Sequence, residues 1–123
     1  QVLLAEELQK PLIIHCVKAW DELKSVRNKI KTTVSWIIHG YRGNVQQTEQ
    51  LAALGFKFSI REKYNEEVVR TIPLSSLFCE TDMSTLSIFE IYKSVASTLQ
   101  IDIEYLIEVI HANINESFCK YEM

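Results

Sequence analysis

Short apolar runs that alternate with amphipathic stretches constrain the fold of this chain more than any other feature. The apolar runs have the length of strands and lie at residues 11–16, 34–39, 56–60 and 74–80. The stretches after them have helical spacing and lie at residues 19–30, 45–55, 65–72 and 86–99, with a last one at 103–118. Strands that are each followed by a helix are typical of a parallel sheet. Runs without polar alternation indicate a sheet covered on both faces.

Local signals predict where several of these helices begin and end. A first helical stretch at residues 2–9 should end before Pro11, which disfavours helical backbone in the residue before it. Gly55 is a natural stop for the helix at 45–55. Ser84 or Ser87 is expected to cap the helix at 86–99.

Composition limits the class of protein. The 123 residues are 47% hydrophobic, which is enough for one core, so we expect a single domain over residues 1–123. The formal net charge is -3, so any contact with nucleic acid must be local. No apolar run approaches a membrane span of about 18 residues and no signal peptide is recognisable, which predicts a cytoplasmic protein without membrane contact. Cys16, Cys79 and Cys119 are odd in number and widely spaced, so reduced thiols are expected.

Metal-ligating side chains follow three of the predicted strands. His15 and His39 each come directly after an aliphatic run, and Glu80 and Asp82 follow the fourth strand. Because chemistry in parallel sheets gathers at the carboxyl ends of the strands, these groups could face one pocket. Imidazoles and a carboxylate suit a divalent metal, which makes a bound water acidic enough for hydrolysis. Each histidine could also be structural, and these residues alone leave both interpretations open.

The order and spacing of several segments resemble the TatD family of metal-dependent deoxyribonucleases. The segments are PLIIHC followed by Lys18 and Ala19, then WIIHGYRGN, FKFSI and IPLSSLFCETD. The resemblance implies a TIM-barrel fold, one or two divalent metal ions (zinc, manganese or magnesium) and hydrolysis of phosphodiester bonds in DNA. It further implies that His15, His39 and Asp82 are metal ligands and that Asp82 is also the catalytic carboxylate.

Two departures from the family pattern shape the expected fold. The family's His-x-His motif and its Glu motif are absent from these 123 residues, and a TIM barrel takes about 250 residues. We therefore expect the C-terminal half of a TIM (β/α)8 barrel, with strands five to eight in parallel and alternating with helices. Such a chain should be inactive alone and should need the missing N-terminal half or a second copy. In addition, Arg61 places a large charge after a strand end where a small residue would leave a pocket open.

Further polar and aromatic positions carry weaker expectations. Lys18 and Arg42 follow strand ends and could bind a substrate phosphate, although each could equally be a solvated or loop-stabilising cation. Glu80 could support a metal ligand from behind or make a structural hydrogen bond. Packing roles are expected for Trp20, Trp36 and Tyr41, with Tyr41 the one that could also contact substrate. No functional role is expected for His111, which lies in the last amphipathic stretch, away from every strand end.

The sequence thus predicts a metal-dependent hydrolase of the TatD type. A metal-activated water would attack a phosphodiester in DNA or in a small substrate, and Asp82 would accept the proton. Two alternatives stay open: a half barrel that serves only interaction or assembly, and a related hydrolase that cleaves another ester or an amide.

Overall fold

The computed structural model of the chain describes residues 12–14, 24, 35–81 and 86–119. Within them, four strands pair in parallel in the order β1-β2-β3-β4. The strands are β1 (Leu12–Ile14), β2 (Trp36–Ile38), β3 (Phe56–Ile60) and β4 (Leu77–Cys79). The parallel sheet that alternates with helices is therefore confirmed for this part of the chain.

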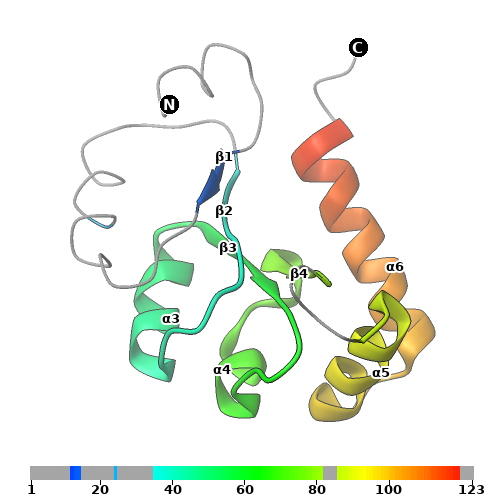
Figure 1. Cartoon of the computed structure of the whole chain (residues 1–123). Helices are drawn as coiled ribbons and strands as arrows, with labels where there is room; N and C mark the ends of the chain where they lie inside the picture. Colours follow the sequence, from blue (N-terminus) through cyan, green and yellow to red (C-terminus); the bar gives the residue numbers. More distant parts are fainter. Residues whose placement is uncertain (1–11, 15–23, 25–34, 82–85, 120–123) are drawn as a thin grey trace.

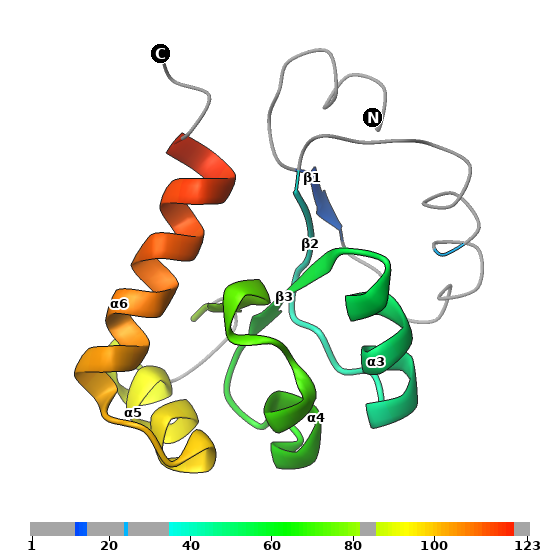
Figure 2. The ribbon, with the colours of Figure 1, turned by 180° about the vertical axis from the view of Figure 1, so that it is seen from behind.

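The helices follow one another around the sheet, as Figures 1 and 2 show from opposite sides. They are α3 (Val45–Ala53), α4 (Glu66–Thr71), α5 (Ile88–Leu99) and α6 (Ile103–Ile114), with a short 3-10 turn η1 (Leu74–Ser76) and a π-helical turn η2 (Asn115–Cys119). Each α-helix packs against the next, and α6 also packs on β4. The predicted helices at 2–9 and 19–30 lie outside the described residues. No helix in the described part is long and apolar enough to cross a membrane.

Side-chain caps fix the beginnings of α3, α4 and α5. Asn44 accepts a hydrogen bond from the backbone of Gln47 and forms a capping box at the start of α3, and Asn65 caps α4. Ser87, one of the two predicted caps, accepts from Glu90 N at the start of α5. Gly55 has a φ of 92° and follows α3, as the prediction of a glycine stop requires. Local sequence therefore sets most helix boundaries.

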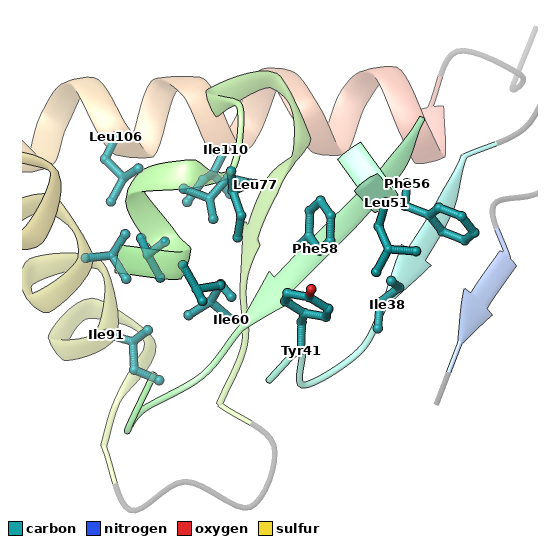
Figure 3. Packing of buried hydrophobic residues seen from close by; sticks show 14 of the residues in the cluster. Ile38, Tyr41, Leu51, Phe56, Phe58, Ile60, Leu77, Ile91, Leu106 and Ile110 are labelled. Carbon is teal, nitrogen blue, oxygen red and sulfur yellow. The ribbon is translucent and has the colours of Figure 1, made fainter. Parts of the chain in front are cut away.

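The core lies between the sheet and its helices, and Figure 3 shows its central part. Alternate residues of β2, β3 and β4 are buried in it: Trp36, Ile38, Phe56, Phe58, Ile60 and Leu77. Leu51, Val69, Ile91, Leu106 and Ile110 cover them from the helices. Each fully buried side chain of this size stabilises the fold by about 1.5–3 kcal/mol.

The fourth strand is shorter than the run at residues 74–80 predicts. Pro73 has a φ of -59°, and Ser76 N donates a 2.8 Å hydrogen bond to Pro73 O, which turns the chain into η1. Asn113 of α6 holds this junction, because its side-chain amide donates 2.8 Å hydrogen bonds to Leu74 O and Leu77 O. Pairing with β3 can begin only after the turn, at Leu77.

Candidate functional site

The described site lies beyond the carboxyl ends of β2, β3 and β4. His39 directly follows β2, Arg61 follows β3 and Glu80 follows β4. In extended backbone, every second side chain points to the same face. His39, Arg61 and Glu80 therefore continue the face of the sheet opposite to the one that carries Trp36 and Leu77. Three neighbouring strands bring these polar groups to one edge of the sheet.

His39 and Glu80 are in direct contact. Nδ1 of His39 lies 2.6 Å from Oε2 of Glu80, and the two side chains are 21% and 11% exposed. Oε1 of Glu80 accepts a short hydrogen bond from the backbone N–H of Gly40. Oε2 is buried and has no hydrogen-bond partner among the described residues, so the ion-pair contact with His39 is what compensates its burial.

Backbone pairing positions Glu80 for this contact. Its N–H donates a 2.8 Å hydrogen bond to Ile60 O, which extends the β3–β4 ladder by one residue. Strands in a sheet lie about 4.8 Å apart, so β2 and β4, with β3 between them, are about 10 Å apart. The side chains of His39 and Glu80 span that gap above the end of β3. Glu80 thus lies behind a candidate metal ligand and also accepts a structural hydrogen bond from Gly40 N, so both roles considered for it stay open.

This contact is compatible with His39 as a metal ligand. With its proton on Nδ1 toward the carboxylate, the imidazole carries its lone pair on Nε2, the tautomer that can coordinate a metal through that nitrogen. Metal-ligating histidines commonly donate their other N–H to a carboxylate, which fixes the ring and raises its basicity. The donor chemistry of His39 and Glu80 therefore fits a divalent metal. The described residues contain no group of three His, Cys, Asp or Glu side chains close enough to hold one by themselves.

Glycine is required at position 40 for two reasons, the backbone angle there and the close approach of Arg61. Its φ is 60°, which L-residues with a side chain adopt only at a cost. A Cβ added here would lie 3.1 Å from Cζ of Arg61. The guanidinium of Arg61 thus lies against the backbone of Gly40, whose N–H donates to Glu80. The large side chain predicted after β3 does cover this strand end.

Two groups near the site, one buried and one partly buried, are held in their neutral forms. Burial, followed by the negative charge of Glu80, raises the pKa of Cys79 to about 12, so this free thiol is protonated at neutral pH and is a poor nucleophile. Burial also raises the pKa of Tyr41, partly offset by its hydrogen bond with Thr48. Neither group can supply a nucleophilic anion near pH 7.

The predicted site residues divide into described and undescribed positions. His15, Lys18 and Asp82 lie outside the described residues, so their predicted roles stay predictions. Arg42 is described and exposed on the loop between β2 and α3.

The structure also describes the positions of Tyr41, His111 and Gly40. Tyr41, which the sequence left open for substrate contact, is 3% exposed and packs edge-on against Phe58. His111 is exposed on α6. The sequence reasoning overlooked Gly40, although a glycine directly after a strand-end histidine signals unusual backbone.

Comparisons with known proteins agree with this fold. The family described as TatD related DNase matches residues 1–119. The metal-dependent hydrolase YjjV of Escherichia coli, itself uncharacterized, is 29% identical over 89 residues, which are 67% of this chain and 34% of that protein. This chain therefore spans about a third of that relative's length.

Two solved structures share the fold. The crystal structure of YjjV from Escherichia coli superposes with a TM-score of 0.84 at 19% identity, over 95% of this chain and 53% of that one. A TatD family hydrolase from Entamoeba histolytica superposes with a TM-score of 0.81 at 15% identity, over 96% of this chain and 54% of that one. With a family match that covers nearly all of its residues, the chain belongs to the TatD family.

Proposed function

We propose that this chain is part of a metal-dependent hydrolase that cleaves phosphodiester bonds in DNA. The observation that carries the proposal is the contact between His39 Nδ1 and Glu80 Oε2 at the carboxyl end of the sheet. Metal-ligating histidines almost always donate their other ring N–H to a carboxylate, a backbone carbonyl or water, which fixes the tautomer and the ring orientation, and Glu80 is placed to accept in this way. The family description as a DNase supports a nucleic-acid substrate.

Each candidate site residue has a defined role in this proposal. His39 would hold the metal ion together with His15 and Asp82, while Glu80 fixes the orientation of the His39 ring. When bound, a divalent cation supplies Lewis acidity for the phosphoryl oxygen and for the attacking water. Asp82 would accept the proton of that water. Arg42 and Lys18 would bind phosphate oxygens of the DNA strand, Arg42 those of a phosphate next to the cleaved bond. Zinc, manganese and magnesium are the candidate ions.

We also infer that the chain forms one half of a barrel. In the described sheet, β1 and β4 are the outer strands, and Ile13 of β1 is 44% exposed. An open edge with exposed apolar residues favours pairing with further strands. Solved relatives that superpose on nearly the whole chain are about twice as long. The partner would be the other half of the barrel or a second copy of this chain.

Hydrolysis assays test the proposed activity. The whole protein that carries this chain should cleave single-stranded DNA and a small phosphodiester in the presence of zinc or manganese, but not an acyl substrate. Cleavage of the acyl substrate alone would instead indicate an ester or amide hydrolase. Absence of all hydrolysis despite bound metal would support an interaction module.

Metal titration tests the shared site independently. Calorimetry should show weak binding to this chain alone and far tighter binding to the whole protein, because only part of the ligand set lies here. Equal affinities would contradict a site shared between two halves. Light scattering after size-exclusion chromatography tests the half barrel, since a concentration-independent, cooperatively folding monomer of this chain would contradict it. A cytoplasmic location stays a prediction from the sequence.

A further inference from the structure

A cavity of about 330 Å³ opens between the loops that follow β2 and β3. Its lining combines apolar, aromatic and cationic side chains: Ile60, Val68, Tyr41, Tyr64, Arg42 and Lys63. The two aliphatic residues are buried, while the two cations are exposed. None of the described residues that line the cavity carries a carboxylate, so its lining charge is positive. Neither His39 nor Glu80 lines it, which makes it a separate feature from the site above.

The backbone on both sides of Arg42 is fixed. Tyr41 N donates a 3.0 Å hydrogen bond to Ser59 O, and the Tyr41 hydroxyl lies 2.8 Å from Oγ1 of Thr48. On the other side, Gly43 lies so close to the Tyr41 ring that an added Cβ would be 2.2 Å from its hydroxyl oxygen. Arg42 thus starts from a fixed position, which lowers the entropy cost of binding an anion.

Lys63 reaches the cavity from a strained but well-supported loop. Its φ of 64° is left-handed, which costs a residue with a side chain about 1–2 kcal/mol. The next residue, Tyr64, anchors the loop to α5, because its hydroxyl lies 2.7 Å from both Ser94 Oγ and Thr98 Oγ1. Asn65 then caps α4. Strain that persists under such support is characteristic of functional positions.

We propose that this cavity binds the substrate phosphate next to the one that is cleaved, so that the protein selects a nucleic-acid strand over an isolated phosphodiester. The proposal rests on the proposed function, whose reaction takes place near His39. Three residues of extended chain span at most about 11 Å, so Arg42 lies within one or two nucleotides of His39. Arg and Lys are the side chains that bind phosphate, and the Tyr64 ring beside an apolar floor suits a base or sugar.

Two substitutions in the whole protein test the selection of a strand. Arg42→Met removes one cation at similar length, and Lys63→Asn removes the other with a residue that tolerates left-handed backbone. Lys93→Met is the matched control, because Lys93 is exposed on α5 and outside the cavity. The substrates are a short single-stranded DNA and bis-para-nitrophenyl phosphate, which has a single phosphate.

Each cavity substitution should lower kcat/KM for the DNA by about tenfold, as expected for loss of a charged phosphate contact, with less than about twofold change for the small diester. The slope of log(kcat/KM) for DNA against log salt should fall by about 0.7 for each cation removed. Lys93→Met should leave the small-diester rate unchanged and should not produce the tenfold loss on DNA. Equal losses on both substrates would place the cations at the cleaved phosphate and overturn the proposal, as would no loss on DNA.

Binding without hydrolysis separates this proposal from the proposed function. In the metal-free whole protein with a chelator present, the oligonucleotide should shift the NMR amide signals of Gly43 and Asn65. The double variant Arg42→Met with Lys63→Asn should lose these shifts. This result would support the cavity even if no hydrolysis were found. Inorganic phosphate that binds as tightly as the oligonucleotide, or shifts that survive in the double variant, would overturn selection of a strand by these two cations.

Discussion

Replacement of Glu80 by glutamine tests the arrangement on which the candidate metal site depends. The substitution keeps the size of the side chain and removes its charge. Glutamine can still accept the hydrogen bond from Gly40 N through its amide oxygen. Its amide nitrogen would then face Nδ1 of His39 as a donor, so the imidazole would have to accept there and carry its proton on Nε2. That tautomer cannot bind a metal through Nε2.

The structure sets the expected magnitudes. Glu80 makes two charge-assisted contacts, with Gly40 N and with His39 Nδ1, and the variant keeps the first in weakened form. Hydrogen bonds to charged groups contribute about 1.5–3 kcal/mol, so we expect a loss of about 1–2 kcal/mol in the free energy of unfolding. For a domain of this size that lowers Tm by about 4–8 °C. Loss of support behind a metal ligand should reduce metal affinity by about 10–100-fold.

Three measurements follow these effects separately. Nitrogen-15 NMR of the His39 imidazole in this chain reports the tautomer without any metal. Thermal unfolding reports stability, and calorimetric titration of the whole protein with zinc reports affinity. Glu108→Gln is the control, since Glu108 is an exposed carboxylate on α6 and its replacement changes the net charge equally.

The reasoning would be refuted by an unchanged tautomer together with unchanged zinc affinity in Glu80→Gln. A loss of stability with the tautomer preserved would mean that Glu80 only braces the Gly40 turn. Glu108→Gln should change none of the three measurements beyond their error.

Three further predictions concern catalysis, pH and packing. In the whole protein, Asp82→Asn should abolish hydrolysis and leave Tm unchanged, because it removes the charge and the base at constant size; retained turnover would contradict its assigned role. Since the pKa of Cys79 is raised from 9.0 to about 12, the unfolded chain loses this proton first, so stability present below pH 9 should be lost as the pH rises toward 12. Cys79→Ala should make that fall smaller in thermal scans at pH 8 to 11, and an identical pH profile would rule out the thiol as its cause. Asn113→Ala should lower the free energy of unfolding by about 1–3 kcal/mol in urea titrations, because it leaves the buried carbonyls of Leu74 and Leu77 without these donors; an unchanged midpoint would show that other groups satisfy them.

The local periodicity of hydrophobic residues was sufficient to predict much of the described fold. The helices α3, α4 and α5 lie within the predicted ranges, and α6 with η2 accounts for the last one. Hydrophobic spacing, Gly55 and Ser87 act within a few residues, so a single sequence displays them. The short length of β4 could not be predicted from local sequence. It depends on the turn that Pro73 starts and that Asn113, on a helix distant in sequence, stabilises through hydrogen bonds.

The sequence by itself determined the alternation of strands and helices, the parallel sheet and the placement of His39 and Glu80 at strand ends, since these follow from residue spacing and short-range propensity. Only the tertiary structure decided that Glu80 contacts His39, that the Arg61 guanidinium lies against Gly40, and that Arg42 and Lys63 share a cavity. Each of these contacts joins residues about 20 to 40 positions apart in the chain. They depend on strand order, register and side-chain reach across neighbouring strands, which no local pattern encodes.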